Sequence, residues 1–114
     1  MLRCKNKIIA SKIVYCDTFF KKGTGLIFKS KNSVNNTAWV FRFEKPRRVG
    51  ITMFFVSFPI DVVFLDKSNR VIELKENFRP FHNYTSASKI HSFIELKNGT
   101  IQKYSLKKGI ILQF

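Results

Sequence analysis

Asp61 is the residue whose type and position could most readily do chemistry. It interrupts a nearly continuous apolar run from Ile60 to Leu65, and a carboxylate in such surroundings must be paired or hydrogen-bonded. An unpaired carboxylate would suit general acid or base catalysis, whereas one that accepts bonds from a basic side chain or from loop amides fixes the fold. We favour the structural role, with Lys22 as the first expected partner and Arg79 as the second.

An enzyme would need a second group within reach of Asp61. Lys22 and His82 are the candidates, but the sequence has no Ser-His-Asp set, no matched nucleophile and no pair of carboxylates at a recognisable spacing. Gly23-Thr24-Gly25 is not a phosphate loop, because no Lys-Ser or Lys-Thr follows it. The sequence therefore favours a non-enzymatic binding protein over an enzyme that uses Asp61.

The segment Arg79-Pro80-Phe81-His82-Asn83-Tyr84 mixes cations with aromatic rings. Such a mixture can stack on a base or a sugar. It can also form a lid in which Phe81 and Tyr84 fill the mouth of a barrel, and we favour the lid. The predicted ligand-binding residues are Lys22, Thr52, Met53, Asp61, Arg79, His82 and Tyr84.

The charge of the chain predicts an affinity for polyanions. Twenty-one Lys and Arg residues against seven Asp and Glu residues give a formal net charge of +14, and nucleic acid is the usual cellular polyanion. The cations are spread widely, and only Lys45-Pro46-Arg47-Arg48 is dense, so Lys45, Arg47 and Arg48 are the expected contacts of RNA or DNA. Phosphate contacts of this kind release counterions and would be sensitive to salt. The alternative is a solvated cationic surface without a partner.

Cysteine and histidine are too few for a metal site. Cys4 and Cys16 cannot supply the four ligands of structural zinc, and His82 and His91 lack a third partner at ligand spacing. We expect both cysteines to be reduced and buried, with a disulfide between them as the less favoured alternative. No metal or other cofactor is predicted.

The 114 residues are predicted to form one domain, residues 1–114. Thirteen Phe residues exclude a disordered chain. No run approaches the ~18 apolar residues of a membrane helix. No apolar segment with a cleavage site follows the basic start, so we expect a cytoplasmic protein without a membrane partner.

Short strands dominate the sequence pattern. The clearest element is a hairpin over Ile60–Lys75, whose turn is Asp66-Lys67-Ser68-Asn69. Residues 38–43 alternate so that Trp39, Phe41 and Phe43 share one face, which we assign to the core. Further strands are expected at 7–15, 49–56, 89–96 and 109–114, with a turn at 44–46, a long connection over 76–88, a hairpin turn at 98–99 and a short helical or irregular turn within 101–106.

Seven to eight short strands cannot remain a flat sheet, because its edges and one apolar face would be exposed. One short helix is expected near residues 17–23, since Asp17 can cap it and Gly23 can end it. The predicted fold is mostly β: a small curved antiparallel β-barrel or sandwich with this one helix.

Two stretches of the chain resemble a known family. Gly25-Leu26-Ile27-Phe28-Lys29 follows the expected helix, and Met53-Phe54-Phe55-Val56-Ser57-Phe58-Pro59-Ile60-Asp61 leads into the buried hairpin. Together they resemble the domain of unknown function 192 in its archaeal form. In that family a helix ending in Arg-x-x-Gly-Leu-Met precedes an aromatic strand and then Pro-Leu-Asp. The resemblance covers about residues 16–109, and Met53 with Pro59-x-Asp61 is its specific part.

The sequence departs from that family at four places. Lys22 stands where the family has Arg, Ile27 where it has Met, and Thr52 where a Trp or His often precedes the Met. Gly109-Ile110 replaces a Gly-Asp pair. The resemblance implies a compact, mostly β fold without a settled reaction. A binding module of unknown ligand is therefore the leading hypothesis, with a nucleic-acid-associated protein and an enzyme using Asp61 as the alternatives.

Overall fold

The computed structural model describes residues 1–16, 30–54 and 56–114. Its elements, in chain order, are β1 (Leu2–Cys4), β2 (Lys7–Ala10), β3 (Lys12–Tyr15), the 3₁₀ helix η1 (Lys31–Val34), β4 (Thr37–Arg47), β5 (Gly50–Thr52), β6 (Ile60–Leu65), β7 (Val71–Phe78), β8 (Asn83–Thr85), β9 (Ile90–Lys97) and α2 (Thr100–Lys103). The fold is mostly β, as predicted.

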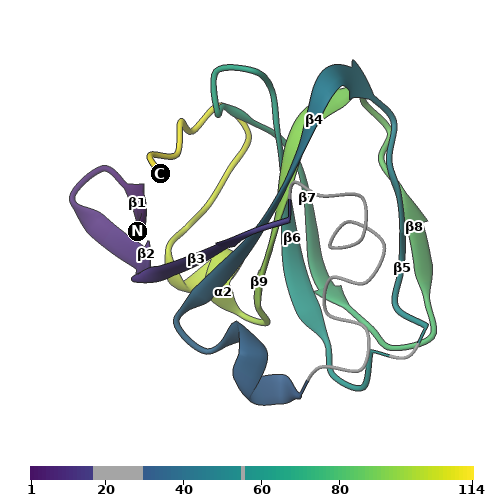
Figure 1. Cartoon of the computed structure of the whole chain (residues 1–114). Coiled ribbons are helices and arrows are strands. Elements are labelled where there is room, and N and C mark those ends of the chain that lie inside the picture. The colour runs from purple at the N-terminus through teal and green to yellow at the C-terminus, as the bar shows by residue number, and fades with distance from the viewer. Residues whose placement is uncertain (17–29, 55) are drawn as a thin grey trace.

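Five strands form a central sheet in the order β3-β4-β9-β6-β7. The pairs β4–β9, β9–β6 and β6–β7 are antiparallel, and β3 pairs with β4 in parallel, so the sheet is mixed where an antiparallel one was predicted. Every residue of β6 is buried, because this strand lies inside the sheet and is covered on both faces. Two short ribbons, β1–β2 and β5–β8, stand on either side of the central sheet (Figure 1).

The alternating strands of the central sheet divide the buried side chains into two cores. The first core lies between the sheet and the β5–β8 ribbon, and it includes Phe41, Ile51, Met53, Phe64 and Phe93. Trp39 and Phe43 pack against it, so the predicted core stripe is confirmed. The second core lies on the other face, under β1–β2, α2 and the C-terminal segment, and it includes Leu2, Ile9, Val63, Ile94 and Ile101. This layering is a sandwich; among the described residues the strands do not close into a barrel.

Several elements follow the sequence pattern closely. The hairpin is confirmed as β6–β7, and the Asp66 carboxylate accepts hydrogen bonds from the amides of Ser68 at 2.8 Å and Arg70 at 3.0 Å in its turn. Cys4 and Cys16 are buried and are not joined by a disulfide, as expected. The predicted helix near residues 17–23 lies outside the described residues.

Other predicted elements are wrong in detail. The turn expected at 44–46 is absent, because β4 continues through Pro46 and absorbs it in a register shift between Arg42 and Arg47. The connection expected over 76–88 contains the end of β7 and all of β8. The strand expected at 109–114 is reduced to isolated bridges at Ile111 and Gln113. With residues 7–15 divided into β2 and β3, the described chain has nine strands where seven to eight were predicted.

The predicted hairpin turn at Asn98-Gly99 is also corrected. Gly99 does have a positive φ of 92°, as such a turn requires. The chain then enters α2 rather than a returning strand. The amides of Gly99 and Ile101 donate hydrogen bonds to a buried carboxylate described below, which holds the chain in this turn. The helical turn expected after this point is confirmed.

Candidate functional site

The β5–β8 ribbon presents one face to the first core and the other to solvent. Ile51 and Tyr84, which pair across the ribbon, point toward the core. The alternate residues are exposed, namely Gly50 and Thr52 on β5 and Asn83 and Thr85 on β8. The outward residues therefore carry short side chains or, at Gly50, none.

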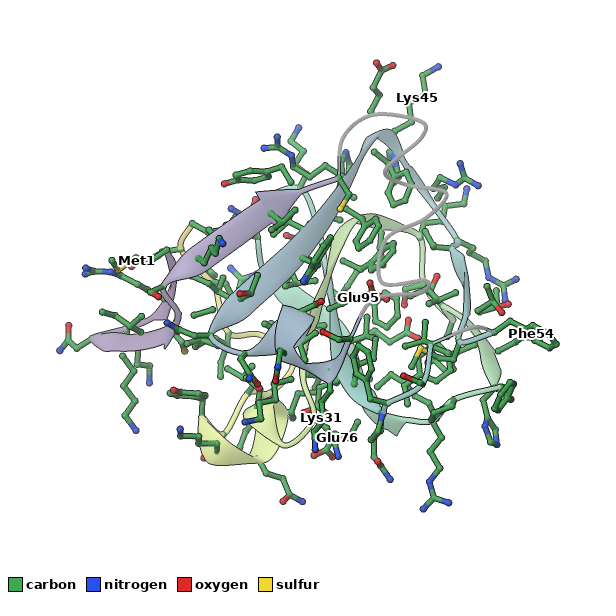
Figure 2. The ribbon with its side chains drawn as sticks, turned by 60° about the horizontal axis from the view of Figure 1, so that its bottom comes forward. Met1, Lys31, Lys45, Phe54, Glu76 and Glu95 are labelled. Carbon is green, nitrogen blue, oxygen red and sulfur yellow. The ribbon has the colours of Figure 1, made fainter. Side chains whose placement is uncertain are left out.

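Two aromatic side chains project from one end of this ribbon. Phe54 is 51% exposed and Phe81 is 71% exposed. Their ring centroids are 5.8 Å apart with an interplanar angle of 88°, which is an edge-to-face contact. We call this pair the aromatic tip. Figure 2 shows Phe54 pointing away from the body of the protein.

The backbone at the aromatic tip holds Phe81 in an unusual conformation. Phe81 has a φ of 64°, which is rare for a bulky residue. The amide of His82 donates to the carbonyl of Arg79 at 3.3 Å, and the Phe81 amide donates to the carbonyl of Met53 at 3.1 Å. Pro80 before a residue of positive φ is the pattern of a type II turn, where Gly is usual at the position Phe81 holds. The turn therefore keeps a strained Phe in solvent, and strain of this kind concentrates at functional sites.

The ribbon is fastened to the central sheet by Glu73 of β7. The Glu73 carboxylate accepts hydrogen bonds from the Tyr84 hydroxyl, from the Ala87 amide at 3.0 Å and from the Ser88 amide at 3.1 Å. Burial by itself would raise the pKa of Glu73, but these hydrogen bonds and the charge of Lys108 outweigh it, so the pKa is lowered. The hydrogen bond to Glu73, then burial and the charge of Glu73, raise the pKa of Tyr84 to about 12.

The predicted basic cluster lies at the other end of the ribbon. Lys45, Arg47 and Arg48 are exposed, and Figure 2 shows Lys45 at the tip where β4 ends its run. The Arg47 guanidinium lies 5.3 Å from the centre of the Phe43 ring, and Arg48 Nε donates to the Ser86 carbonyl at 3.0 Å. We call these three cations the basic end.

Among the described residues, the partners of Asp61 are backbone amides. It is 1% exposed, and its carboxylate accepts hydrogen bonds from the amides of Asn77 at 3.0 Å, Gly99 at 3.1 Å and Ile101 at 2.9 Å. Asn77 sits where β7 shifts register against β6, so its amide lacks a partner in the ladder. The acid therefore ties this bulge and the start of α2 to the centre of the sheet.

The prediction that Arg79 binds Asp61 is wrong. Backbone amides, and not the Arg79 side chain, donate the hydrogen bonds to this carboxylate among the described residues. The carboxylate is also sealed from solvent, so it cannot serve as the catalytic group of the enzyme hypothesis. Asp61 faces the second core, whereas Met53 and Tyr84 belong to the first, and the sheet separates them. Lys22, the other expected partner, lies outside the described residues.

The remaining predicted ligand residues do meet on the ribbon. Thr52 pairs with Asn83, the Met53 amide donates to the His82 carbonyl at 2.9 Å, and Arg79 and His82 are exposed beside the aromatic tip. Met53 itself is fully buried, so its side chain supports the surface without contacting a ligand. Tyr84 is half-buried and packs on the first core, whereas the exposed Phe81 does not form the predicted lid.

Sequence reasoning missed two features. Phe54 was read only as part of a strand, and its partnership with Phe81 depends on a turn with positive φ that no local pattern announces. Glu95 lies within the strand expected at 89–96, but its burial was not predicted. Glu95 is 6% exposed, and desolvation raises its pKa to about 8. Figure 2 shows it in the interior of the molecule.

Neither a metal site nor a membrane helix is found in the part of the chain described. No group of three or more His, Cys, Asp or Glu side chains there could hold a metal ion. None of its helices is long and apolar enough to cross a bilayer.

Comparison with known proteins places the chain among uncharacterised relatives. It is 33% identical over 109 residues to a UPF0127 protein of Thermococcus sibiricus, covering 94% of this chain and 68% of the relative. It is 30% identical over 110 residues to a UPF0127 protein of Thermococcus kodakarensis, covering 96% and 69%.

Solved structures share the fold. A protein of unknown function from Novosphingobium aromaticivorans superposes with a TM-score of 0.81 at 18% identity, covering 90% of this chain and 74% of that one. A protein from Sinorhizobium meliloti, named as a candidate transcription regulator, has a TM-score of 0.81 at 19% identity, with 89% and 79% covered. The family model of domain of unknown function 192, described as an uncharacterized ACR, matches residues 2–114. The chain therefore belongs to the domain of unknown function 192 family.

Proposed function

We propose that this protein is a non-enzymatic binding module that holds single-stranded nucleic acid on the outer face of the β5–β8 ribbon. The observation that carries the proposal is the aromatic tip, in which Phe54 and Phe81 are 51% and 71% exposed. Nucleic-acid bases stack on aromatic rings whatever their sequence, because every base has a π-face. Apolar surface kept in water is unfavourable, and a stacked base would cover it.

Cations at both ends of the ribbon can contact the phosphates of the same strand. Arg79 lies beside the aromatic tip, and the basic end lies beyond the opposite end of β5. The path from Arg48 to Phe54 is about 20 Å of extended chain at 3.3 Å per residue. Between these ends, Gly50, Thr52 and Thr85 are exposed and place no long side chain on the outer face of the ribbon. A short single strand could therefore cross the ribbon with bases at the tip and phosphates at the basic end.

Three broader observations support the same function. The net charge of +14 attracts a polyanion from a distance. The sealed carboxylate of Asp61 removes the catalytic group that the sequence offered first. The Sinorhizobium meliloti protein, which shares the fold, is named as a candidate transcription regulator.

The test is fluorescence anisotropy with a labelled oligouridylate at two salt concentrations. Phe54→Ala/Phe81→Ala should weaken binding by about tenfold or more, since each stacked base contributes roughly 1–3 kcal/mol. Ile8→Ala/Ile111→Ala is the matched control, because these side chains are also exposed but lie away from the ribbon, at 45% and 47%.

Removal of the basic end gives a second, independent measurement. Lys45→Gln/Arg47→Gln/Arg48→Gln should lower the slope of log affinity against log salt by about 2, at roughly 0.7 per lost phosphate contact of a single strand. Lys12→Gln/Lys67→Gln/Lys107→Gln removes the same charge elsewhere. Equal losses in the two triple variants, or no binding at low salt, would contradict the proposal.

A further inference from the structure

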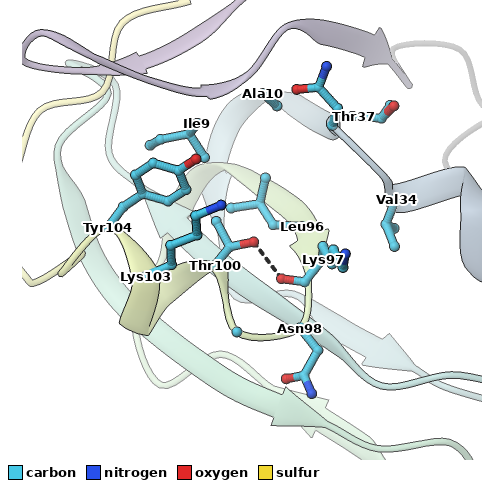
Figure 3. Close-up of a pocket in the computed structure, with 12 residues that line it drawn as sticks. Ile9, Ala10, Val34, Thr37, Leu96, Lys97, Asn98, Thr100, Lys103 and Tyr104 are labelled. Atoms are coloured by element: carbon cyan, nitrogen blue, oxygen red, sulfur yellow. Dashed lines mark hydrogen bonds between the residues drawn. The ribbon is translucent and has the colours of Figure 1, made fainter.

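A second candidate site lies on the other side of the central sheet. A cavity of about 280 Å³ opens where β2, the start of β4, the end of β9 and α2 meet (Figure 3). Ile9, Ala10 and Leu96 of its lining belong to the second core and Val34 belongs to the first, but no residue of the β5–β8 ribbon lines it. A ligand held here would therefore be separate from a strand bound on the ribbon.

The floor of this cavity is apolar. Ile9 and Ala10 of β2, Val34 of η1 and Leu96 of β9 line it, and all four are buried. Such a floor favours a ligand with a hydrocarbon part. The volume lies just under the roughly 300–1,000 Å³ of pockets for drug-sized molecules, so the ligand must be small.

The rim of the cavity is cationic. Lys97 and Lys103 line it and are exposed, and no Asp or Glu is among the described residues that line it. The Asp61 carboxylate accepts a hydrogen bond from the amide of Gly99 in this lining. Figure 3 shows the Lys103 side chain reaching over the floor beside Leu96 and Thr100. The Lys103 ammonium also lies 5.4 Å from the centre of the Tyr104 ring, so the ring helps to hold the cation at the rim.

Most polar groups at the rim that are not already used in hydrogen bonds are donors. The Thr100 hydroxyl donates to the Lys97 carbonyl at 2.6 Å, and the Gly99 amide is used by Asp61. The Lys97 and Lys103 ammonium groups, the Tyr104 hydroxyl and the Asn98 side-chain amide have no hydrogen-bond partner among the described residues. A ligand that satisfies them must bring oxygen acceptors, and a negative charge is favoured because two of the donors are cations.

A neighbouring cavity strengthens the positive field. Tyr104 lines both cavities, and on its far side Lys5, Lys7 and Lys107 line a hollow of about 570 Å³. Five lysines thus surround Tyr104 from two directions. Their summed potential would raise the local concentration of anions at the cavity mouth.

We infer that this cavity, which we call the lysine pocket, binds a small organic anion: a carboxylate or phosphate group on a short apolar body. The anionic oxygens accept hydrogen bonds from Lys97 and Lys103, and the apolar body rests on Ile9 and Leu96. The inference does not depend on nucleic-acid binding, because none of the residues that line the pocket belongs to β5, β8 or the aromatic tip.

The test follows backbone amide resonances by NMR while benzoate, phenyl phosphate, inorganic phosphate or neutral benzamide is added. Saturable shifts centred on Gly99, Thr100 and Tyr104 are expected with benzoate, with phenyl phosphate or with both, and the stronger of the two identifies the anionic group. Lys97→Gln/Lys103→Gln should weaken that binding at least tenfold. The control Lys12→Gln/Lys67→Gln removes equal charge and should leave it unchanged.

Four results would overturn the inference. Binding of benzamide as tight as that of the anions would show that the site does not recognise charge. Inorganic phosphate could match phenyl phosphate, which would show that the apolar floor is not used. Shifts spread over all lysines without saturation, or equal losses in the two double variants, would show a diffuse cationic surface instead of a site. Because all four substituted lysines are exposed, an unchanged spectrum without ligand verifies that each variant is folded.

Discussion

Glu95 gives the sharpest prediction about the stability of this fold. Its carboxyl group lies on β9 between Trp39 of β4 and Val62 of β6 in the register of the sheet. Neither neighbour is titratable, and no described residue hydrogen-bonds the Glu95 side chain. Desolvation raises the pKa of Glu95 from 4.5 to about 8, so the folded protein keeps this carboxyl protonated at neutral pH.

The size of the effect follows from proton linkage. Above pH 4.5 the unfolded chain loses the Glu95 proton while the folded chain retains it, so folding must take up a proton. The free energy of unfolding should then fall by about 1.4 kcal/mol per pH unit. This stabilisation is complete below pH 4.5 and is lost as the pH rises through about 8. At pH 7 the loss amounts to about 3 kcal/mol.

Glu95→Gln removes the titration while preserving size. We expect the variant and the natural chain to be about equally stable near pH 4.5, and the variant to be more stable by about 3 kcal/mol at pH 7. Urea unfolding at a series of pH values measures both. Glu76→Gln is the control, because it makes the same substitution at an exposed acid. A Glu95→Gln difference that stays flat from pH 5 to 8 would refute the reasoning, since it would show Glu95 ionised in the fold.

Three further substitutions test other contacts. Asp61→Ala leaves three amides without their acceptor and should lower the free energy of unfolding by about 3 kcal/mol or more, against about 1–3 kcal/mol for Asp61→Asn; equal effects in urea unfolding would contradict this. Tyr84→Phe should lower the free energy of unfolding by about 1–3 kcal/mol and abolish an ultraviolet phenol titration near pH 12. The stabilisation that the Tyr84 hydroxyl provides is full below pH 10 and is lost as the pH rises through about 12. Phe81→Gly should be about 1 kcal/mol more stable than Phe81→Ala, because Gly accepts the positive φ without strain; a less stable Gly variant would argue against a strained turn.

The local sequence pattern was sufficient to predict the centre of the fold. Alternation and turn chemistry specify the Ile60–Lys75 hairpin, because both its strands and the turn that joins them are adjacent in sequence. The core face of Trp39, Phe41 and Phe43 follows for the same reason. The three-residue strand β8 could not be predicted, since Asn83–Thr85 is polar and extended only because β5 pairs with it.

The same holds for the candidate site: features set by residues close in sequence could be predicted, whereas contacts between residues far apart in sequence could not. The sequence indicates that Asp61 needs hydrogen-bond donors, but its donors lie 16, 38 and 40 residues further along the chain, so no spacing rule selects them. Thr52, Arg79 and His82 were predicted as one site and lie together on the ribbon. The surface they share depends on the exposure of Phe54 and Phe81, which only the tertiary arrangement decides.

The most direct test of nucleic-acid binding is to map an unlabelled oligouridylate onto the ¹⁵N-labelled protein by NMR. We predict perturbed amides at Gly50, Thr52, Phe54, Phe81 and Asn83, together with those of the basic end, and little change in α2. Perturbations confined to the lysines around Tyr104, or spread evenly over every cationic residue, would contradict the ribbon as the binding surface.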